Sequence, residues 1–122
     1  MRRPPEWHTW VREERVRLLE SVRFQVAEER LKERKRLAEA FIQTVTAIER
    51  MAEQGNPALH PLSIRVRDVA LSLGITIFGY VGELVDLPDD RVLQHGRGSR
   101  GEVRVVGART EDFVIKPKVI GQ

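Results

Sequence analysis

The stretch from Glu6 to Gln54 contains neither glycine nor proline, and this constrains the fold more than any other feature of the 122-residue chain. Because both residues interrupt helices, their absence predicts one continuous helix from about residue 6 to about residue 53. Pro4 and Pro5 suit its first turn, where backbone N–H groups have no intrahelical partner. At about 1.5 Å per residue this helix would span roughly 70 Å, far more than a small globular domain needs.

The predicted helix carries two apolar stripes with a charged stretch between them. The second stripe recurs at alternating steps of three and four, which places its residues on one helix face. It comprises Ala38, Phe41, Val45, Ile48 and Ala52, with Leu37, Thr44 and Met51 beside it. The first, looser stripe comprises Val11, Leu18, Leu19, Val22 and Val26. Residues 28–36 hold one apolar residue, Leu31, and cannot bury a face.

A lone helix would expose these stripes to water, so we expect a coiled-coil homodimer. Trp7 and Trp10, three residues apart, would form one aromatic patch that either seals the end of the coiled coil or docks a partner.

A shorter amphipathic helix is predicted after the turn Gly55-Asn56-Pro57, since apolar residues again step by three and four from Leu59 to Leu73. Gly74 would end it with a left-handed cap. We expect this helix to pack against the long helix or to pair with that of a second copy, giving a small helical bundle. The residues expected to mediate dimerisation are Leu37, Phe41, Val45, Ile48, Leu62, Val66 and Val69.

Beyond Gly74 the composition is that of short strands joined by turns, rich in β-branched and aromatic residues. Strands are predicted at 75–80, 102–106 and 112–120, with a short bridge near 91–93 and turns at Gly82, 96–101 and 107–112. Pro117 lacks a ladder donor and is expected at an edge or a bulge. The chain is therefore predicted to be an α+β protein with a coiled-coil rod (1–54), a turn and short helix (55–74) and a small, mostly antiparallel β head (75–122).

The composition excludes several classes of function. The chain has no cysteine, which removes disulfides, thiol nucleophiles and cysteine-ligated zinc. His8, His60 and His95 lie in different segments without metal-ligand spacing, and no serine or carboxylate pair has a catalytic context. We therefore expect no enzyme activity, no metal and no cofactor. No apolar run approaches the roughly 20 residues of a membrane span, so we expect no membrane association and a cytoplasmic location.

The net charge of +3 is spread over both halves of the chain. Residues 1–54 hold 12 basic and 10 acidic residues, and residues 55–122 hold 9 and 8. Opposite charges three or four residues apart, such as Glu29 and Lys32, indicate a solvated, salt-bridged helix surface. We do not expect nucleic acid as the main partner, although the basic cluster from Lys32 to Arg36 leaves that alternative open.

Residues 96–101, Gly-Arg-Gly-Ser-Arg-Gly, match the dinucleotide-binding pattern G-x-G-x-x-G. That site requires the loop to leave a strand and open a helix, whereas here it leads into a predicted strand. We interpret it as a hairpin loop, with a mobile basic finger formed by Arg97 and Arg100 as the alternative.

The order of elements and four short motifs resemble GrpE, the nucleotide exchange factor of DnaK-type chaperones, over about residues 30–120. The motifs are Leu73-Gly74-Ile75, Gly82-Glu83-Leu84-Val85-Asp86-Leu87-Pro88, Gly101-Glu102-Val103 and Val114-Ile115-Lys116-Pro117-Lys118-Val119-Ile120. The chain departs from the family's Gly-Glu-Pro-Phe-Asp-Pro segment, because Leu84-Val85 replaces Pro-Phe and Leu87 replaces the second proline. Asp90 stands where a histidine usually follows, and the turn between the last strands is shortened to residues 107–110.

The resemblance implies a parallel homodimer whose β head binds the nucleotide-binding domain of an Hsp70-class ATPase and promotes ADP release. By position in the family, the partner-binding residues would be Val85, Asp86, Leu87, Val106 and Gly107, with Arg34, Arg36 and Arg50 on the rod. The residues alone also permit strand-core positions for the two valines and a turn role for the aspartate. Two further alternatives are a dimeric coiled-coil nucleic-acid-binding protein and a structural adaptor without exchange activity.

Overall fold

The computed structural model describes residues 5–121, and its first element is α1, a helix of 49 residues from Pro5 to Glu53. This confirms the continuous helix predicted from the absence of glycine and proline. The helix ends at the predicted place, where Gly55 adopts a φ of 108° that favours glycine. The N–H of Asn56 donates to the carbonyl of Ala52 at 3.3 Å. Pro4, predicted in the first turn, lies outside the described residues.

The chain divides into two compact units, residues 1–35 and residues 36–122. The division falls within α1, whereas the predicted boundary at residue 54 marks the end of the helix. In the first unit, the described residues belong to the N-terminal part of α1. The second unit contains the remainder of α1, the second helix and all the strands. It begins at Arg36 because α1 supplies core residues from Ala38 onward.

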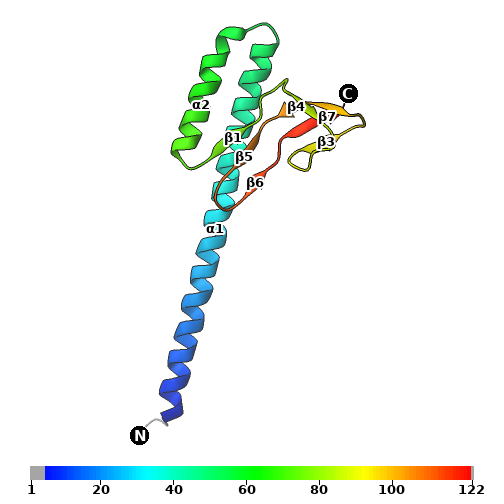
Figure 1. Cartoon of the computed structure of the whole chain (residues 1–122). Helices are drawn as coiled ribbons and strands as arrows, with labels where there is room; N and C mark the ends of the chain where they lie inside the picture. Colours follow the sequence, from blue (N-terminus) through cyan, green and yellow to red (C-terminus); the bar gives the residue numbers. More distant parts are fainter. Residues whose placement is uncertain (1–4, 122) are drawn as a thin grey trace. The chain divides into compact units, whose positions relative to one another are not determined.

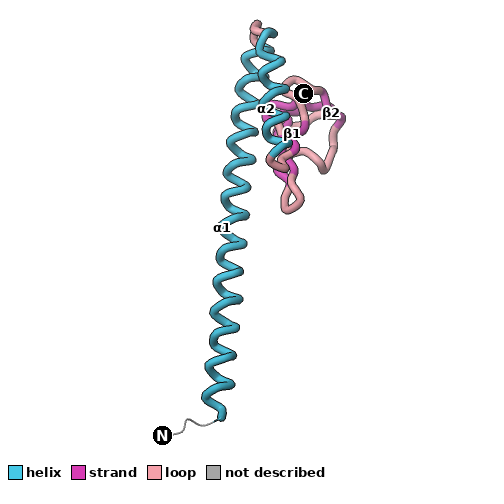
Figure 2. The backbone as a smooth tube through the Cα atoms, turned by 90° about the vertical axis from the view of Figure 1, so that its left-hand side faces the viewer, coloured by secondary structure: helices cyan, strands magenta, loops and turns pink. Residues whose placement is uncertain are grey.

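The second helix, α2 (His60–Ser72), follows the 3₁₀ turn η1 (Pro57–Leu59) and lies beside the C-terminal part of α1 (Figures 1 and 2). Its end has the hydrogen bonds of a Schellman motif. Ile75 donates its N–H to the carbonyl of Ala70 at 2.9 Å, and Gly74 donates to that of Leu71 at 2.9 Å. Gly74 has a φ of 79°, which confirms the predicted left-handed cap.

In the part of the chain that the structure describes, the β head contains seven short strands in two sheets. The first sheet has the order β1 (Thr76–Phe78), β5 (Gly107–Arg109), β6 (Val114–Ile115), with antiparallel neighbours. The second has the order β2 (Leu84–Asp86), β4 (Arg100–Val105), β7 (Lys118–Gly121), β3 (Leu93–His95). Among the described strand pairs, β3–β7 alone is parallel. The chain is therefore an α+β protein with a mostly antiparallel β head, as predicted.

Two apolar clusters hold the second unit together. The larger lies between the helices and the first sheet and contains Ala38, Ile42, Val45, Ala70, Ile75, Ile77, Val106 and Ala108. The smaller lies on the second sheet and contains Leu87, Val103 and Val119, with Val85 and Val92 packed against them. The first sheet thus shares its core with α1 and α2, whereas the second sheet has a small apolar cluster of its own.

The β4 and β5 strands are separated by a single residue, Val106, although they belong to different sheets. The side chain of Val106 is fully buried in the larger cluster. Its N–H donates to Oγ1 of Thr46 on α1 at 3.2 Å, so the backbone between the two sheets is fastened to the helix.

Several predicted strand boundaries were wrong. The strand predicted at 112–120 is divided at Pro117 into β6 and β7, which lie in different sheets, because proline cannot continue the ladder. The predicted turn at 107–112 contains β5, and the strand β2 was not predicted. The loop at 96–99 is not a hairpin loop, since β3 and β4 lie on opposite sides of β7 rather than beside each other.

Candidate interaction surfaces

A buried ion pair joins the two helices next to the β head. Arg67 of α2 donates from Nη2 to Oε2 of Glu49 on α1 at 2.8 Å, and the two side chains are 11% and 5% exposed. The carboxylate of Glu49 also accepts hydrogen bonds from the Ser63 hydroxyl and, at 3.1 Å, from the N–H of Val81. The carboxylate of Glu49, on α1, therefore accepts hydrogen bonds from α2 and from the β head, and a buried charge requires such partners.

The guanidinium of Arg67 continues this network into the β head. It donates to the carbonyl of Ile77 at 3.2 Å and to that of Gly79 at 2.6 Å. It also stacks on the ring of Tyr80 at 4.1 Å from the ring centroid. The segment between β1 and β2 is thereby fixed relative to both helices, and this segment forms one side of the groove on the β head described below.

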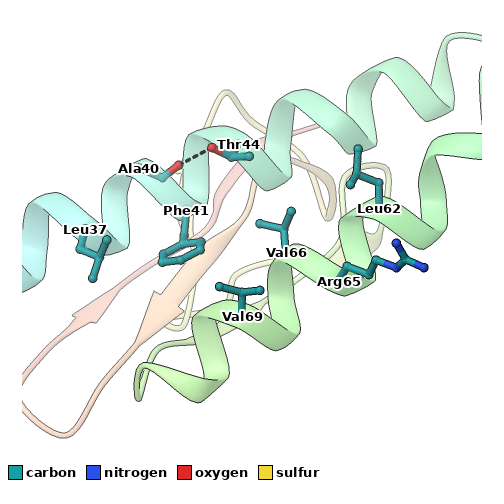
Figure 3. A pocket seen from close by; sticks show the side chains of 8 residues that line it. All are labelled: Leu37, Ala40, Phe41, Thr44, Leu62, Arg65, Val66 and Val69. Carbon is teal, nitrogen blue, oxygen red and sulfur yellow. Dashed lines mark hydrogen bonds between the residues drawn. The ribbon is translucent and has the colours of Figure 1, made fainter.

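An apolar groove runs between α1 and α2 (Figure 3). It has a volume of about 470 Å³ and is lined by Leu37, Ala40, Phe41, Thr44, Leu62, Arg65, Val66 and Val69. Figure 3 shows the ring of Phe41 and the side chain of Val69 directed toward one another across it. The hydroxyl of Thr44 donates to the carbonyl of Ala40 at 2.8 Å, which leaves little polar character in the groove.

The groove brings together five of the seven residues predicted to mediate dimerisation, namely Leu37, Phe41, Leu62, Val66 and Val69. The other two lie elsewhere. Val45 is fully buried in the protomer's own core, where no second copy could reach it, and Ile48 is half-buried outside the groove lining. The 3.6-residue period identified the apolar stripe of α1. It could not show that one side of the stripe packs into the core, as Val45 does, while the other lines the groove, as Phe41 does.

A second groove, of about 940 Å³, lies on the β head. Its apolar lining comes from both sheets and includes Phe78, Val85, Val103 and Pro117. Its charged lining consists of Glu83, Asp86, Asp89, Asp90 and Arg91. We call it the β-head groove. Four carboxylates and one guanidinium give its wall an excess of negative charge, which favours a basic partner.

Asp89 and Arg91 form a local pair in this wall. Oδ1 of Asp89 accepts from Nε of Arg91 at 3.0 Å and from its backbone N–H at 2.9 Å, and Oδ2 accepts from Nη2 at 2.9 Å. The side-chain hydrogen bond from Arg91, followed by its backbone hydrogen bond, lowers the pKa of Asp89. The same hydrogen bond raises the pKa of Arg91. This pair fixes the loop after β2 and neutralises the groove's one guanidinium.

The predicted partner-binding residues of the β head divide into two sets. Val85 and Asp86 line the β-head groove, and the side chain of Asp86 is 93% exposed. Leu87, Val106 and Gly107 are buried, so a direct contact of these three residues with a partner does not fit the structure. At Gly107 a Cβ would lie 2.6 Å from the carbonyl oxygen of Ile115, so glycine is required there by close strand packing.

The predicted basic residues on α1 are not equivalent. Arg36 is exposed, whereas Arg50 donates from Nε and Nη2 to the carbonyl of Arg104 on β4 at 3.2 and 2.9 Å. Arg50 therefore holds the helix to the second sheet. Arg34 belongs to the other compact unit and is half-buried. The predicted pair of Glu29 and Lys32 is present, with Nζ 3.5 Å from Oε1.

The N-terminal part of α1 exposes an apolar surface of its own. The rings of Trp7 and Trp10 lie with their centroids 5.5 Å apart, which confirms the predicted aromatic patch. Apolar side chains at Leu18, Val22 and Val26 follow it along the helix and are also exposed. Within residues 5–35, this surface needs a partner to be shielded from water.

The sequence interpretation missed Glu49, Arg67 and Phe78, which organise and line the surfaces described here. A signal for Glu49 was present, because it follows Val45 by four residues and so lies on the apolar face of α1. A charged residue on an apolar helix face requires a buried partner. No signal near Arg67 distinguished it from Arg65, its exposed neighbour on α2.

Neither protein-family models, nor curated proteins, nor solved structures match the chain. In the part of the chain that the structure describes, there is no cluster of three or more metal-ligating side chains. None of the described helices is both long and apolar enough to cross a membrane.

Proposed function

We propose that this protein is a GrpE-like co-chaperone, which binds the nucleotide-binding domain of an Hsp70-class ATPase and promotes ADP release. The observation that carries the proposal is the sequence of elements: a helix of 49 residues, a short helix packed beside it and a small two-sheet β head. The motif that resembles the GrpE segment, Gly82 to Pro88, includes the edge strand β2 and borders the β-head groove.

The two grooves support different parts of this proposal. The apolar groove between α1 and α2 suits a second copy, because it is lined almost entirely by aliphatic and aromatic side chains and contains most of the predicted dimerisation residues. The β-head groove suits the ATPase, because its wall combines apolar and charged groups at an exposed position. Such a protein acts without a cofactor or catalytic residue, and we propose the cytoplasm as its location.

The mechanism requires only differential binding. A β head that binds the open nucleotide-binding cleft more tightly than the closed, ADP-bound cleft shifts the ATPase toward the open state by that difference in affinity. Arg67 is a positioning residue in this mechanism, since it holds the segment between β1 and β2 while the groove side chains contact the partner.

The test is the release rate of a fluorescent ADP analogue from an Hsp70-class ATPase of the same source. We expect the protein to accelerate release, and the double variant Asp86→Ala/Asp90→Ala to lose most of the acceleration. The matched control is Glu111→Ala/Asp112→Ala, which removes two carboxylates from the loop between β5 and β6. No acceleration by the unaltered dimer would contradict the proposal and favour the adaptor. Salt-sensitive binding of a nucleic acid duplex in its place would favour the nucleic-acid alternative.

A further inference from the structure

The outer side of β2 is a free sheet edge. Among residues 5–121, β2 lies at the end of its sheet and pairs with β4 only. The carbonyl of Glu83 accepts a hydrogen bond from Val103 at 2.9 Å, and the N–H of Leu87 donates to the residue before β4 at 2.8 Å. Because alternate residues of a strand direct their backbone groups to opposite sides, the N–H and C=O groups of Leu84 and Asp86 point away from β4.

The β-head groove lies along this edge. All three residues of β2, Leu84 to Asp86, line the groove. Its apolar lining includes Phe78 of β1 and Pro117, both from outside the second sheet. A chain placed along the edge would thus have hydrogen-bonding groups on one side and an apolar surface beneath it, which are the two requirements of strand addition.

The charges of the groove specify the kind of chain that fits. Glu83, Asp86, Asp89 and Asp90 oppose a single cation, Arg91, which Asp89 already holds. Oδ1 of Asp86 also lies 3.6 Å from Nε of Arg100. Both side chains are largely exposed, so an incoming cation can replace this weak ion pair.

We propose that the β2 edge binds an extended segment of another protein, in which basic side chains alternate with apolar ones. The main chain of the segment pairs with Leu84 and Asp86. Since side chains alternate between the two faces of a strand, its apolar side chains lie on the face of Val85, over the apolar lining. Its basic side chains lie on the face of Asp86. This inference concerns the edge itself and does not depend on exchange activity.

A second copy of this chain is a poorer occupant. Pairing two β2 edges would bring two grooves together that both carry an excess of carboxylates, and like charges on neighbouring strands are destabilising. The acidic edge thus discourages self-association while it remains open to a basic segment.

The test uses a fluorescein-labelled eight-residue peptide of alternating lysine and valine, with fluorescence anisotropy as the readout. We expect saturable binding that weakens with salt, and no binding of the glutamate–valine peptide. N-methylation of alternate peptide residues should weaken binding about fivefold or more, because it removes main-chain donors. In amide NMR spectra, Leu84 and Asp86 should shift more than residues of the opposite edge strand, β3.

Two variants complete the test. Leu84→Pro removes an outward N–H from the edge strand β2 without changing the charge of the groove, and it should reduce affinity at least fivefold. Gln94→Pro removes an outward N–H from β3, because the inward N–H of that strand is that of Leu93, which donates to the carbonyl of Pro117. This control variant should leave the affinity unchanged, since the peptide is expected to pair with β2. Absence of saturable binding below about 1 mM, or equal binding of the N-methylated peptide, would overturn the inference. Neither outcome changes the expected result of the ADP-release assay. Failure of the strand-addition proposal can therefore be distinguished from failure of the proposed exchange function.

Discussion

Arg67 and Glu49 lie 18 residues apart in the chain and form a buried ion pair, with Nη2 and Oε2 at 2.8 Å. Three elements meet at this pair, because Glu49 belongs to α1, Arg67 to α2, and the same guanidinium binds carbonyl groups of the β head. The pair therefore couples the packing of the helices to the position of the segment that borders the β-head groove.

Replacing Arg67 with alanine should lower the free energy of unfolding by about 3–5 kcal/mol, because Glu49 would remain buried without its countercharge. Arg67→Lys should cost less, since it keeps the charge but loses the planar guanidinium that reaches two carbonyl groups and Tyr80. Denaturant unfolding followed by circular dichroism, at one protein concentration, measures both effects. The control is Asp68→Ala, an exposed neighbour on α2. Equal stability of Arg67→Ala and Asp68→Ala would show that the pair contributes nothing.

Val69→Glu should convert a dimer into a monomer. Val69 is 53% exposed in the protomer and lines the apolar groove, so a carboxylate there is tolerated in the monomer but must be desolvated when a second copy covers it. Light scattering after gel filtration gives the mass. Leu71→Glu is the matched control, because Leu71 is 59% exposed on the same helix and does not line the groove. A Val69→Glu protein with the mass of the unaltered protein would place the interface elsewhere.

Asp89 should titrate below the ordinary aspartate pKa of about 3.9, because hydrogen bonds from Arg91 favour its charged form. A carboxyl group whose pKa is lower in the folded state stabilises that state at pH values above its unfolded-state pKa. The stabilisation is lost as the pH falls through the folded-state pKa. The loop after β2 should thus lose this contribution only in acid. Carboxyl NMR titration measures the pKa, and Arg91→Gln should raise it toward the ordinary value. An unchanged pKa in that variant would rule out Arg91 as the cause.

Features that depend on neighbouring residues in the chain were predicted well. The length of α1 follows from the absence of glycine and proline, and its end from Gly55. The end of α2 was predicted from Gly74 alone, because a glycine in the left-handed conformation commonly follows the last turn of a helix. The α+β class follows from the change of composition beyond this glycine.

Features that depend on distant residues could not be predicted. β2 has only three residues, and β4, more than ten residues later, determines that it is a strand. The separation of Val45 from Phe41, one in the core and the other in a groove, depends on where the sheets and α2 pack against α1. The pairing of Glu49 with Arg67 likewise requires the register of two helices, which the charge pattern of either helix does not contain.

The passage of the chain from β4 to β5 through Val106 alone has a mechanical consequence. Because one buried residue joins the two sheets, we expect a load applied at the β2 edge to pass through β4 to β5 without being absorbed by a loop. Because the N–H at this joint is held by Thr46, the load reaches α1 in the middle of its packed half. Arg50 and Glu49 also bind the backbone of the β head, so we expect the head and the C-terminal part of α1 to move together.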